Sequence, residues 1–185
     1  MVPDIDIYIG RVLDSEKGYV NDPADSGGET NFGITVAVAR AFGYFGPMKD
    51  MTREQATTIY RTRYWTQPKF DQINAIDRGL AFILFDTGVN MGQSTGVAYL
   101  QRCLNVLNLE GSLFPDIAAD GGIGAMTIAA LNAFVKARGT AGLRILRDMV
   151  KHLRGASYIT QAENKASQER YEYGWQTRLS DLEPA

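Results

Sequence analysis

Apolar residues recur at helical spacing along most of the chain. Between residues 4 and 16, Ile5, Ile9 and Val12 fall on one face of a helix, and Glu16 stands at or near its C-terminal end. Such a stripe is typical of an amphipathic helix whose apolar face packs on a core. The pattern therefore predicts a first helix that brings a carboxylate to the start of the following loop.

Later segments keep this spacing and add signals for helix ends. Thr52 and Gln55 have the spacing of a capping box, which predicts the start of a helix. Residues 80–91 are apolar on most sides, as expected of a helix buried in a bundle. Ser94 is expected to cap the next helix, and Gly139 is expected to break a later one. No segment alternates strongly between apolar and polar residues, so the chain is predicted to be mainly α, with at most a small β-hairpin in the first long loop.

That loop, from Asp14 to Thr35, is unusually long and acidic. It holds five carboxylates, four glycines and one proline, whereas most connections are short and longer ones are often functional. Glycoside hydrolysis needs one protonated carboxylic acid for the leaving oxygen and one carboxylate for water or the sugar cation. Glu16, at a helix C-terminus among like charges, is the candidate acid. Asp25 would stay ionised on the opposite face of the sugar, and Thr30 could position a water.

The composition of the loop is also compatible with roles other than catalysis. Asp, Asn and Gly also crowd ordinary turns, because they favour tight backbone conformations. A calcium loop is disfavoured, because residues 22–33 do not have the EF-hand spacing of ligands, glycine and terminal glutamate. We therefore expect no metal and no cofactor, and we expect the single histidine, His152, on the surface.

Composition indicates a soluble globular protein. The chain has 185 residues, of which 45% are hydrophobic and 22% are charged. Its one cysteine, Cys103, lies in an apolar run, so a disulfide framework is excluded and a buried thiol is expected. Neither a signal peptide nor an apolar run of membrane-spanning length is recognisable.

Charge is distributed unevenly along the chain. The formal net charge of −2 excludes a globally basic protein that binds nucleic acid. Residues 1–30 hold seven acidic and two basic residues, whereas residues 136–154 hold six basic residues and one acidic residue. The segment 136–154 is interpreted as a contact for an anionic surface, with a solvated helix face as the alternative.

The acidic loop resembles the signature of a known family. Glu16-Lys-Gly-Tyr-Val-Asn-Asp-Pro-Ala-Asp-Ser-Gly-Gly-Glu-Thr-Asn-Phe-Gly-Ile-Thr is similar to the motif of glycoside hydrolase family 108, the phage and bacterial N-acetylmuramidases. Ile59-Tyr-Arg-Thr-Arg-Tyr-Trp and Phe85-Asp-Thr-Gly-Val-Asn-Met-Gly resemble later blocks of that family. Asp120-Gly-Gly-Ile-Gly-Ala-Met-Thr resembles the companion peptidoglycan-binding segment. Lys17 departs from the family motif, which usually has glycine there.

This resemblance implies a lysozyme-like helical bundle with two regions. Residues 1–94 would form the glycoside hydrolase region, and residues 95–185 a helical peptidoglycan-binding region packed with the first as one compact unit. The implied partners are bacterial peptidoglycan and, through residues 136–154, an anionic cell envelope. The protein is expected to be a monomer that does not bind nucleic acid.

The resemblance also implies roles for individual residues. The catalytic glutamate of the family corresponds to Glu16. By likeness to related phage lysozymes, Asp25 and Thr30 complete the catalytic set, with Asp22 as the alternative second carboxylate. Aromatic and amide side chains that could contact the glycan are Tyr60, Trp65 and Asn90, and core packing is the alternative for Tyr60.

The function that these residues imply is that of a phage endolysin. It would hydrolyse the β-1,4 bond between N-acetylmuramic acid and N-acetylglucosamine, acting on the periplasmic cell wall after release from the cytoplasm of the infected host. Two alternatives stay open: a lytic transglycosylase acting on the same bond, and a wall-binding phage structural module without catalysis. The stereochemical outcome is also open.

Overall fold

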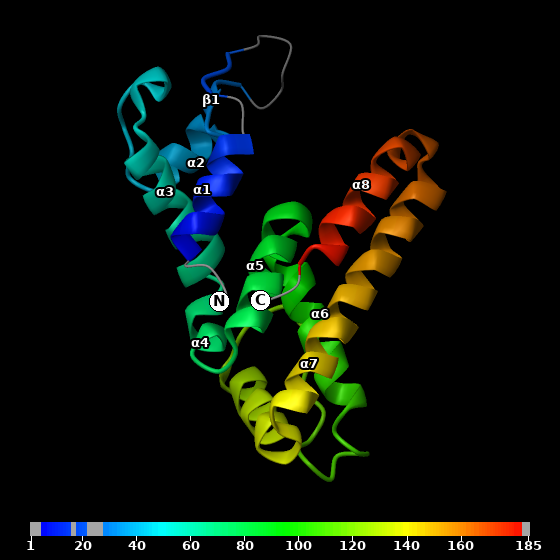
Figure 1. The fold of residues 1–185 in the computed structure, drawn as a ribbon. Coiled ribbons are helices and arrows are strands. Elements are labelled where there is room, and N and C mark those ends of the chain that lie inside the picture. Colours follow the sequence, from blue (N-terminus) through cyan, green and yellow to red (C-terminus); the bar gives the residue numbers. More distant parts are fainter. Residues whose placement is uncertain (1–4, 16–17, 22–27, 183–185) are drawn as a thin grey trace. The chain divides into compact units, whose positions relative to one another are not determined.

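The computed structural model describes residues 5–15, 18–21 and 28–182 (Figure 1). Helices make up most of these residues, and one small antiparallel sheet occurs among them. This confirms the prediction of a mainly α fold with a small hairpin. Backbone contacts divide the chain after Gln67 into two compact units.

The N-terminal unit is built on α1 (Ile5–Ser15) and α3 (Arg53–Arg61), which pack against each other. Ile9 and Leu13 of α1 are buried, and Ile9 belongs to the apolar face that the sequence pattern predicts. Thr52 forms the expected capping box at the start of α3. The unit also contains α2 (Val36–Ala41), the 3₁₀ helix η1 (Met48–Asp50) and the π-helix η2 (Thr62–Thr66).

The small sheet is a hairpin at the C-terminal end of the acidic loop. Its strands are β1 (Thr30–Asn31) and β2 (Ile34–Thr35). The two residues between them, Phe32 and Gly33, have φ angles of 51° and 71°. Two consecutive positive φ angles are typical of the tight turn that matches the twist of a hairpin. The turn therefore fixes the direction in which β1 leaves the acidic loop.

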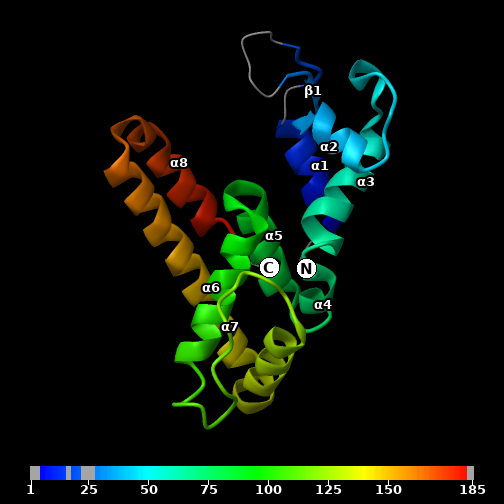
Figure 2. The ribbon, with the colours of Figure 1, turned by 180° about the vertical axis from the view of Figure 1, so that it is seen from behind.

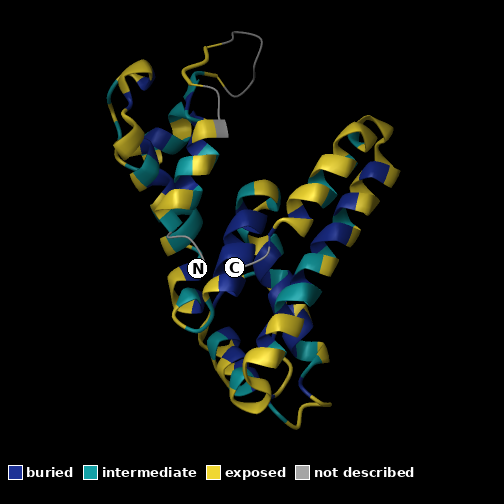
Figure 3. Cartoon of the chain, in the orientation of Figure 1, coloured by how far each residue is buried: buried dark blue, intermediate teal, exposed yellow. Residues whose placement is uncertain are grey.

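The C-terminal unit is arranged around α5 (Arg78–Met91), which is buried along most of its length (Figure 3). This helix contacts α4 (Phe70–Asn74), α6 (Gln93–Val106) and α7 (Ala125–Asn164). Apolar side chains on nearly all sides of α5 meet one or another of these neighbours. The prediction that residues 80–91 form a central buried helix is confirmed.

The turn between α5 and α6 differs from the one expected. Gly92 has a φ of 92° and serves as the N-cap residue of α6, which begins at Gln93. The positive φ of this glycine reverses the chain at once, so the helix starts before Ser94 is reached. The prediction that Ser94 caps this helix is therefore wrong.

The long helix α7 is interrupted at Gly139, where φ is 58° and ψ is −155°. The prediction that Gly139 breaks a helix is confirmed. After the interruption α7 runs on to Asn164, and the 3₁₀ helix η3 (Ala166–Gln168) leads into α8 (Glu169–Ser180). Figure 1 and Figure 2 show α8 lying alongside α7, which it contacts.

A buried ion-pair network joins α5 to α7 and α8. Asp86, which is 5% exposed, lies with its Oδ2 2.6 Å from Arg154 Nη1 and its Oδ1 2.5 Å from Arg178 Nη2. Arg154 is fully buried and also donates hydrogen bonds to the Tyr158 hydroxyl (2.8 Å) and to Thr87 Oγ1 (3.3 Å). These contacts offset part of the cost of burying the guanidinium charge, while Arg154 Nη2 is buried without a hydrogen-bond partner among the described residues.

Candidate active site

The end of α1 is held by an arginine from α3. Arg53 Nη2 donates a hydrogen bond to the Gly10 carbonyl (2.9 Å), and its Nη1 lies 2.8 Å from Asp14 Oδ1. Arg53 is 43 residues from Gly10 in the sequence, so no local pattern predicts this contact. It fixes the last turn of α1, from which the chain continues to Glu16.

The other end of the acidic loop is held by the hairpin. Thr30 is partly exposed in β1, and its backbone N–H and carbonyl pair with those of Val20 at 2.8 and 2.9 Å. The next residue, Asn31, is buried and donates through Nδ2 to the Met48 carbonyl (2.7 Å). These bonds tie β1 both to Val20, near the start of the loop, and to η1. The Thr30 side chain is thus carried on an anchored strand.

Tyr60 lies beneath the hairpin turn. Its side chain is 5% exposed, and its hydroxyl donates to the Phe32 carbonyl at 3.1 Å. This position matches the core-packing alternative for Tyr60, and the tyrosine supports the turn that carries β1. Its role as a glycan contact stays a prediction.

Four residues singled out in the sequence lie outside the described residues. They are the proposed acid Glu16, its neighbour Lys17, and the two candidates for the second carboxylate, Asp22 and Asp25. Their catalytic roles therefore stay predictions. The anchored end of α1 and the hairpin are the described elements that lead into and out of this part of the loop.

One further carboxylate of the loop is described. Glu29 accepts a hydrogen bond from the Tyr19 hydroxyl, which raises the pKa of Tyr19 above its ordinary value. Tyr19 directly precedes Val20 and Glu29 directly precedes Thr30, the two residues that form the bridge. In the sequence Glu29 is one of the five acids of the loop, but no motif predicts its partner, because the pairing depends on the bridge between Val20 and Thr30.

The remaining predicted glycan contacts lie in different units. Trp65 is partly exposed in the π-helix η2, and such helices are rare and often occur at functional sites. Asn90 is exposed on α5 and donates through Nδ2 to the Asp86 carbonyl (2.7 Å). Their roles as substrate contacts stay predictions.

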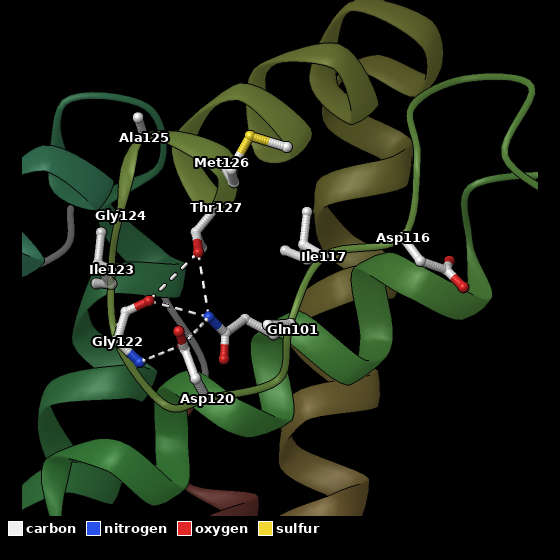
Figure 4. Close-up of a pocket in the computed structure, with 11 residues that line it drawn as sticks. Gln101, Asp116, Ile117, Asp120, Gly122, Ile123, Gly124, Ala125, Met126 and Thr127 are labelled. Carbon is white, nitrogen blue, oxygen red and sulfur yellow. Dashed lines mark hydrogen bonds between the residues drawn. The ribbon is translucent and has the colours of Figure 1, made fainter.

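The motif that begins at Asp120 is organised by a glutamine from α6. Gln101 is buried, and its Nε2 donates to Asp120 Oδ1 (2.9 Å), the Gly122 carbonyl (2.9 Å) and Thr127 Oγ1 (3.1 Å). Its Oε1 accepts from the Gly121 N–H at 2.9 Å. One side chain thus fixes the Asp-Gly-x-x-Gly-x-x-Thr loop against the start of α7 (Figure 4).

The basic segment 136–154 is only partly a free charged face. Arg154 is buried with Asp86, Arg147 lies 3.9 Å from Asp77, and Lys151 lies 3.1 Å from Asp148. Exposed basic side chains of the segment are Lys136, Arg138 and Arg144. Contact of this segment with an anionic envelope stays a prediction, and these three residues are the ones on which it depends.

Within the described ranges, no group of three or more His, Cys, Asp or Glu side chains is arranged to hold a metal ion. In the same part of the chain, no helix combines the length and apolarity that crossing a membrane requires.

The fold and its anchored loops define a helical protein with two regions, one around an acidic connection and one around a glycine-rich turn. Residues 9–92 match the family described as Glycosyl hydrolase 108. Residues 95–180 match the family described as Predicted Peptidoglycan domain. The N-terminal region of this chain therefore belongs to the glycosyl hydrolase 108 family and is followed by a peptidoglycan domain, which confirms the resemblance noted in the sequence.

The chain is also similar to a solved structure, that of Brucella abortus SagA. The two are 27% identical with a TM-score of 0.59, over 95% of this chain and 89% of that chain. No match is found among the curated proteins. Together, the two family regions identify a glycoside hydrolase that acts on peptidoglycan.

Proposed function

We propose that this hydrolase is an N-acetylmuramidase that cleaves the β-1,4 bond between N-acetylmuramic acid and N-acetylglucosamine, with Glu16 as the general acid. The observation that carries the proposal is the family match over residues 9–92, which contains the whole acidic loop. Glu16 opens the motif of that loop and follows directly on α1.

The anchoring of the loop ends supports this proposal. Arg53 holds the last turn of α1, and the Val20–Thr30 bridge and Tyr60 hold the hairpin. Catalytic groups need a supporting shell that keeps them close to their working geometry, since small displacements cost much of the rate. A loop of this length benefits from fixed ends, because they reduce the entropy lost when its carboxylates converge on a substrate.

The proposed mechanism gives each residue one task. Glu16 protonates the glycosidic oxygen as the bond to the leaving sugar breaks. Asp25 faces the other side of the ring and either stabilises the oxocarbenium-like transition state or activates water. The Thr30 hydroxyl, carried on β1, orients that water. Asp22 is the alternative to Asp25.

Substitution of the acid tests the proposal. Glu16→Gln removes the transferable proton at almost unchanged volume, so we expect release of reducing ends from purified peptidoglycan to fall by about 10²–10⁴-fold while the circular dichroism spectrum stays unchanged. Glu54→Gln is the matched control, because Glu54 is an exposed glutamate of the same unit outside the motif. Activity of Glu16→Gln equal to that of the control would refute the assignment.

The products distinguish hydrolysis from transglycosylation. Mass spectrometry of released muropeptides should show reducing ends, whereas 1,6-anhydro ends would identify a lytic transglycosylase. A larger loss for Asp22→Ala than for Asp25→Ala would move the second carboxylate to Asp22. The endolysin role is part of the same proposal, with a monomer acting from the host cytoplasm after release.

A further inference from the structure

The peptidoglycan domain contains a pocket of about 440 Å³ at the start of α7. A cavity of this size holds a small ligand or one residue of a larger one. In Figure 4, the polar groups of Gln101, Asp120 and Thr127 gather around one part of the pocket, and Ile117 and Met126 lie beside them. The pocket thus combines a polar side with an apolar side.

The polar side is rigid. Both ends of the Gln101 amide are used, since Nε2 donates to three acceptors and Oε1 accepts from Gly121. Gly121 has a φ of 75°, and a Cβ atom there would lie 2.6 Å from the Ser94 carbonyl oxygen. Only glycine fits this position, so the turn has one backbone path. A preformed pocket of this kind loses little conformational entropy when it binds a ligand.

The charge of the lining is negative. Asp116 and Asp120 contribute carboxylates, and no lysine or arginine is among the lining residues. Asp116 points away from the cluster around Gln101 (Figure 4) and accepts a hydrogen bond from Asn108 at 2.7 Å. Asp120 is the carboxylate beside the pocket's polar groups, and the Gly122 N–H, followed by Gln101, lowers its pKa from the ordinary value. It is therefore ionised at neutral pH and is available to a cationic group.

The lining also indicates which part of peptidoglycan fits. None of the lining residues is aromatic, so the pocket offers no ring face on which a sugar could stack. An aliphatic chain that ends in an ammonium group matches Ile117 and Met126 on one side and Asp120 on the other. The stem peptides of peptidoglycan carry such a group on their diamino acid, whereas the glycan strand does not.

We propose that this pocket binds the free amine-bearing side chain of a peptidoglycan stem peptide, with Asp120 as the counter-ion. The proposal rests on peptidoglycan as the substrate, and it adds that the domain binds the stem peptide and not the glycan strand. Cross-linking turns the same amine into a neutral amide. The domain should therefore prefer stems that are not cross-linked.

Two matched peptides test the proposal on the full-length protein. One is N-acetyl-L-Ala-γ-D-Glu-L-Lys, whose only amine is on the lysine side chain, and the other carries an acetyl group on that amine. We expect the first peptide to shift methyl NMR signals of Ile117 and Met126 and the second to bind at least about tenfold more weakly, which corresponds to the loss of one ion pair near a surface. A tetramer of N-acetylglucosamine should leave these signals unchanged.

Substitution of Asp120 gives the second arm. Asp120→Asn retains the Oδ1 acceptor for Gln101 and Gly122 but removes the charge, so the fold should persist while the amine-bearing peptide loses about tenfold in affinity. Glu110→Gln is the control, because Glu110 is an exposed carboxylate that is not among the lining residues. Equal binding of both peptides, shifts caused by the sugar tetramer, or unchanged affinity in Asp120→Asn would each overturn the proposal.

Hydrolysis distinguishes this proposal from the proposed muramidase activity. Release of reducing ends from soluble, peptide-free glycan by the unsubstituted protein measures cleavage without any stem peptide. If no glycan is cleaved by the unsubstituted protein but the peptide binds as expected, the muramidase proposal fails and the pocket proposal stands.

Discussion

Removal of the Asp86 charge should destabilise the C-terminal unit more than removal of an exposed charge. Asp86→Asn keeps the size of the side chain but leaves Arg154, which is fully buried, without its counter-ion at 2.6 Å. Breaking one partner of a buried ion pair costs about 3–5 kcal/mol, because the remaining charge stays out of water. Arg178 contributes less to this cost, since its side chain is 46% exposed and water can replace the carboxylate.

The expected change is large enough for thermal and urea unfolding followed by circular dichroism. A protein of this size loses roughly 2–4 °C in Tm per kcal/mol, so Asp86→Asn should lower the Tm by roughly 6–20 °C. Asp148→Asn is the control, because Asp148 pairs with Lys151 at 3.1 Å in a position that is 40% exposed. Such a pair contributes about 0–1 kcal/mol.

A double substitution tests the cause of the loss. In Asp86→Asn combined with Arg154→Met the buried charge is gone, so the double variant should be more stable than the sum of the two single effects predicts. A loss in Asp86→Asn no larger than that of Asp148→Asn would refute the reasoning. Additive effects in the double variant would show that the loss does not arise from the unpaired charge.

Two further predictions concern the thiol and the hairpin. Burial raises the pKa of Cys103 from 9.0 to about 11, so the native protein should react with a thiol reagent about a hundredfold more slowly near pH 8 than the denatured protein. The reaction rate of the native protein should rise with a midpoint near pH 11. A midpoint near pH 9 for the native protein would contradict the shift. Because the folded state holds this proton more tightly, stability should fall as the pH rises from 9 to 11, and Cys103→Ala should remove that part of the fall. Tyr60→Phe removes the hydrogen bond to Phe32 and should cost about 0.5–1.5 kcal/mol in urea unfolding. Tyr60→Phe should also lower the rate of peptidoglycan cleavage more than Tyr64→Phe does. Equal cleavage rates in the two variants would show that the hydrogen bond between Tyr60 and the hairpin does not contribute to catalysis.

Local sequence patterns predicted the helices well. The apolar stripe of α1, the capping box at Thr52 and the break at Gly139 all follow from the periodicity and end chemistry of a single segment. The prediction that Ser94 caps α6 is wrong because a serine that could cap a helix stands two residues after a glycine that starts the helix earlier. Gly92 can adopt a positive φ that ends one helix and begins the next.

Contacts between distant segments could not be predicted in this way. Asp86 meets Arg154 and Arg178 across 68 and 92 residues, and Arg53 reaches α1 across 43 residues. In the sequence, nothing distinguishes these charged residues from ordinary surface residues of a helix. Only the packing of the helices decides that Arg154 is buried and that Arg53 holds the end of α1.

The position of α5 bears on how this protein can be divided or recombined. The two family regions meet between residues 92 and 95, but α5, which ends the first region, has α6 and α7 of the second region as neighbours in its own compact unit. A chimaera joined at that point would expose the apolar surface of α5 unless the new partner reproduced those contacts. A functional exchange of the peptidoglycan domain between relatives of this protein is therefore expected to include α5. The segment that can be exchanged is longer than the boundary between the two families suggests.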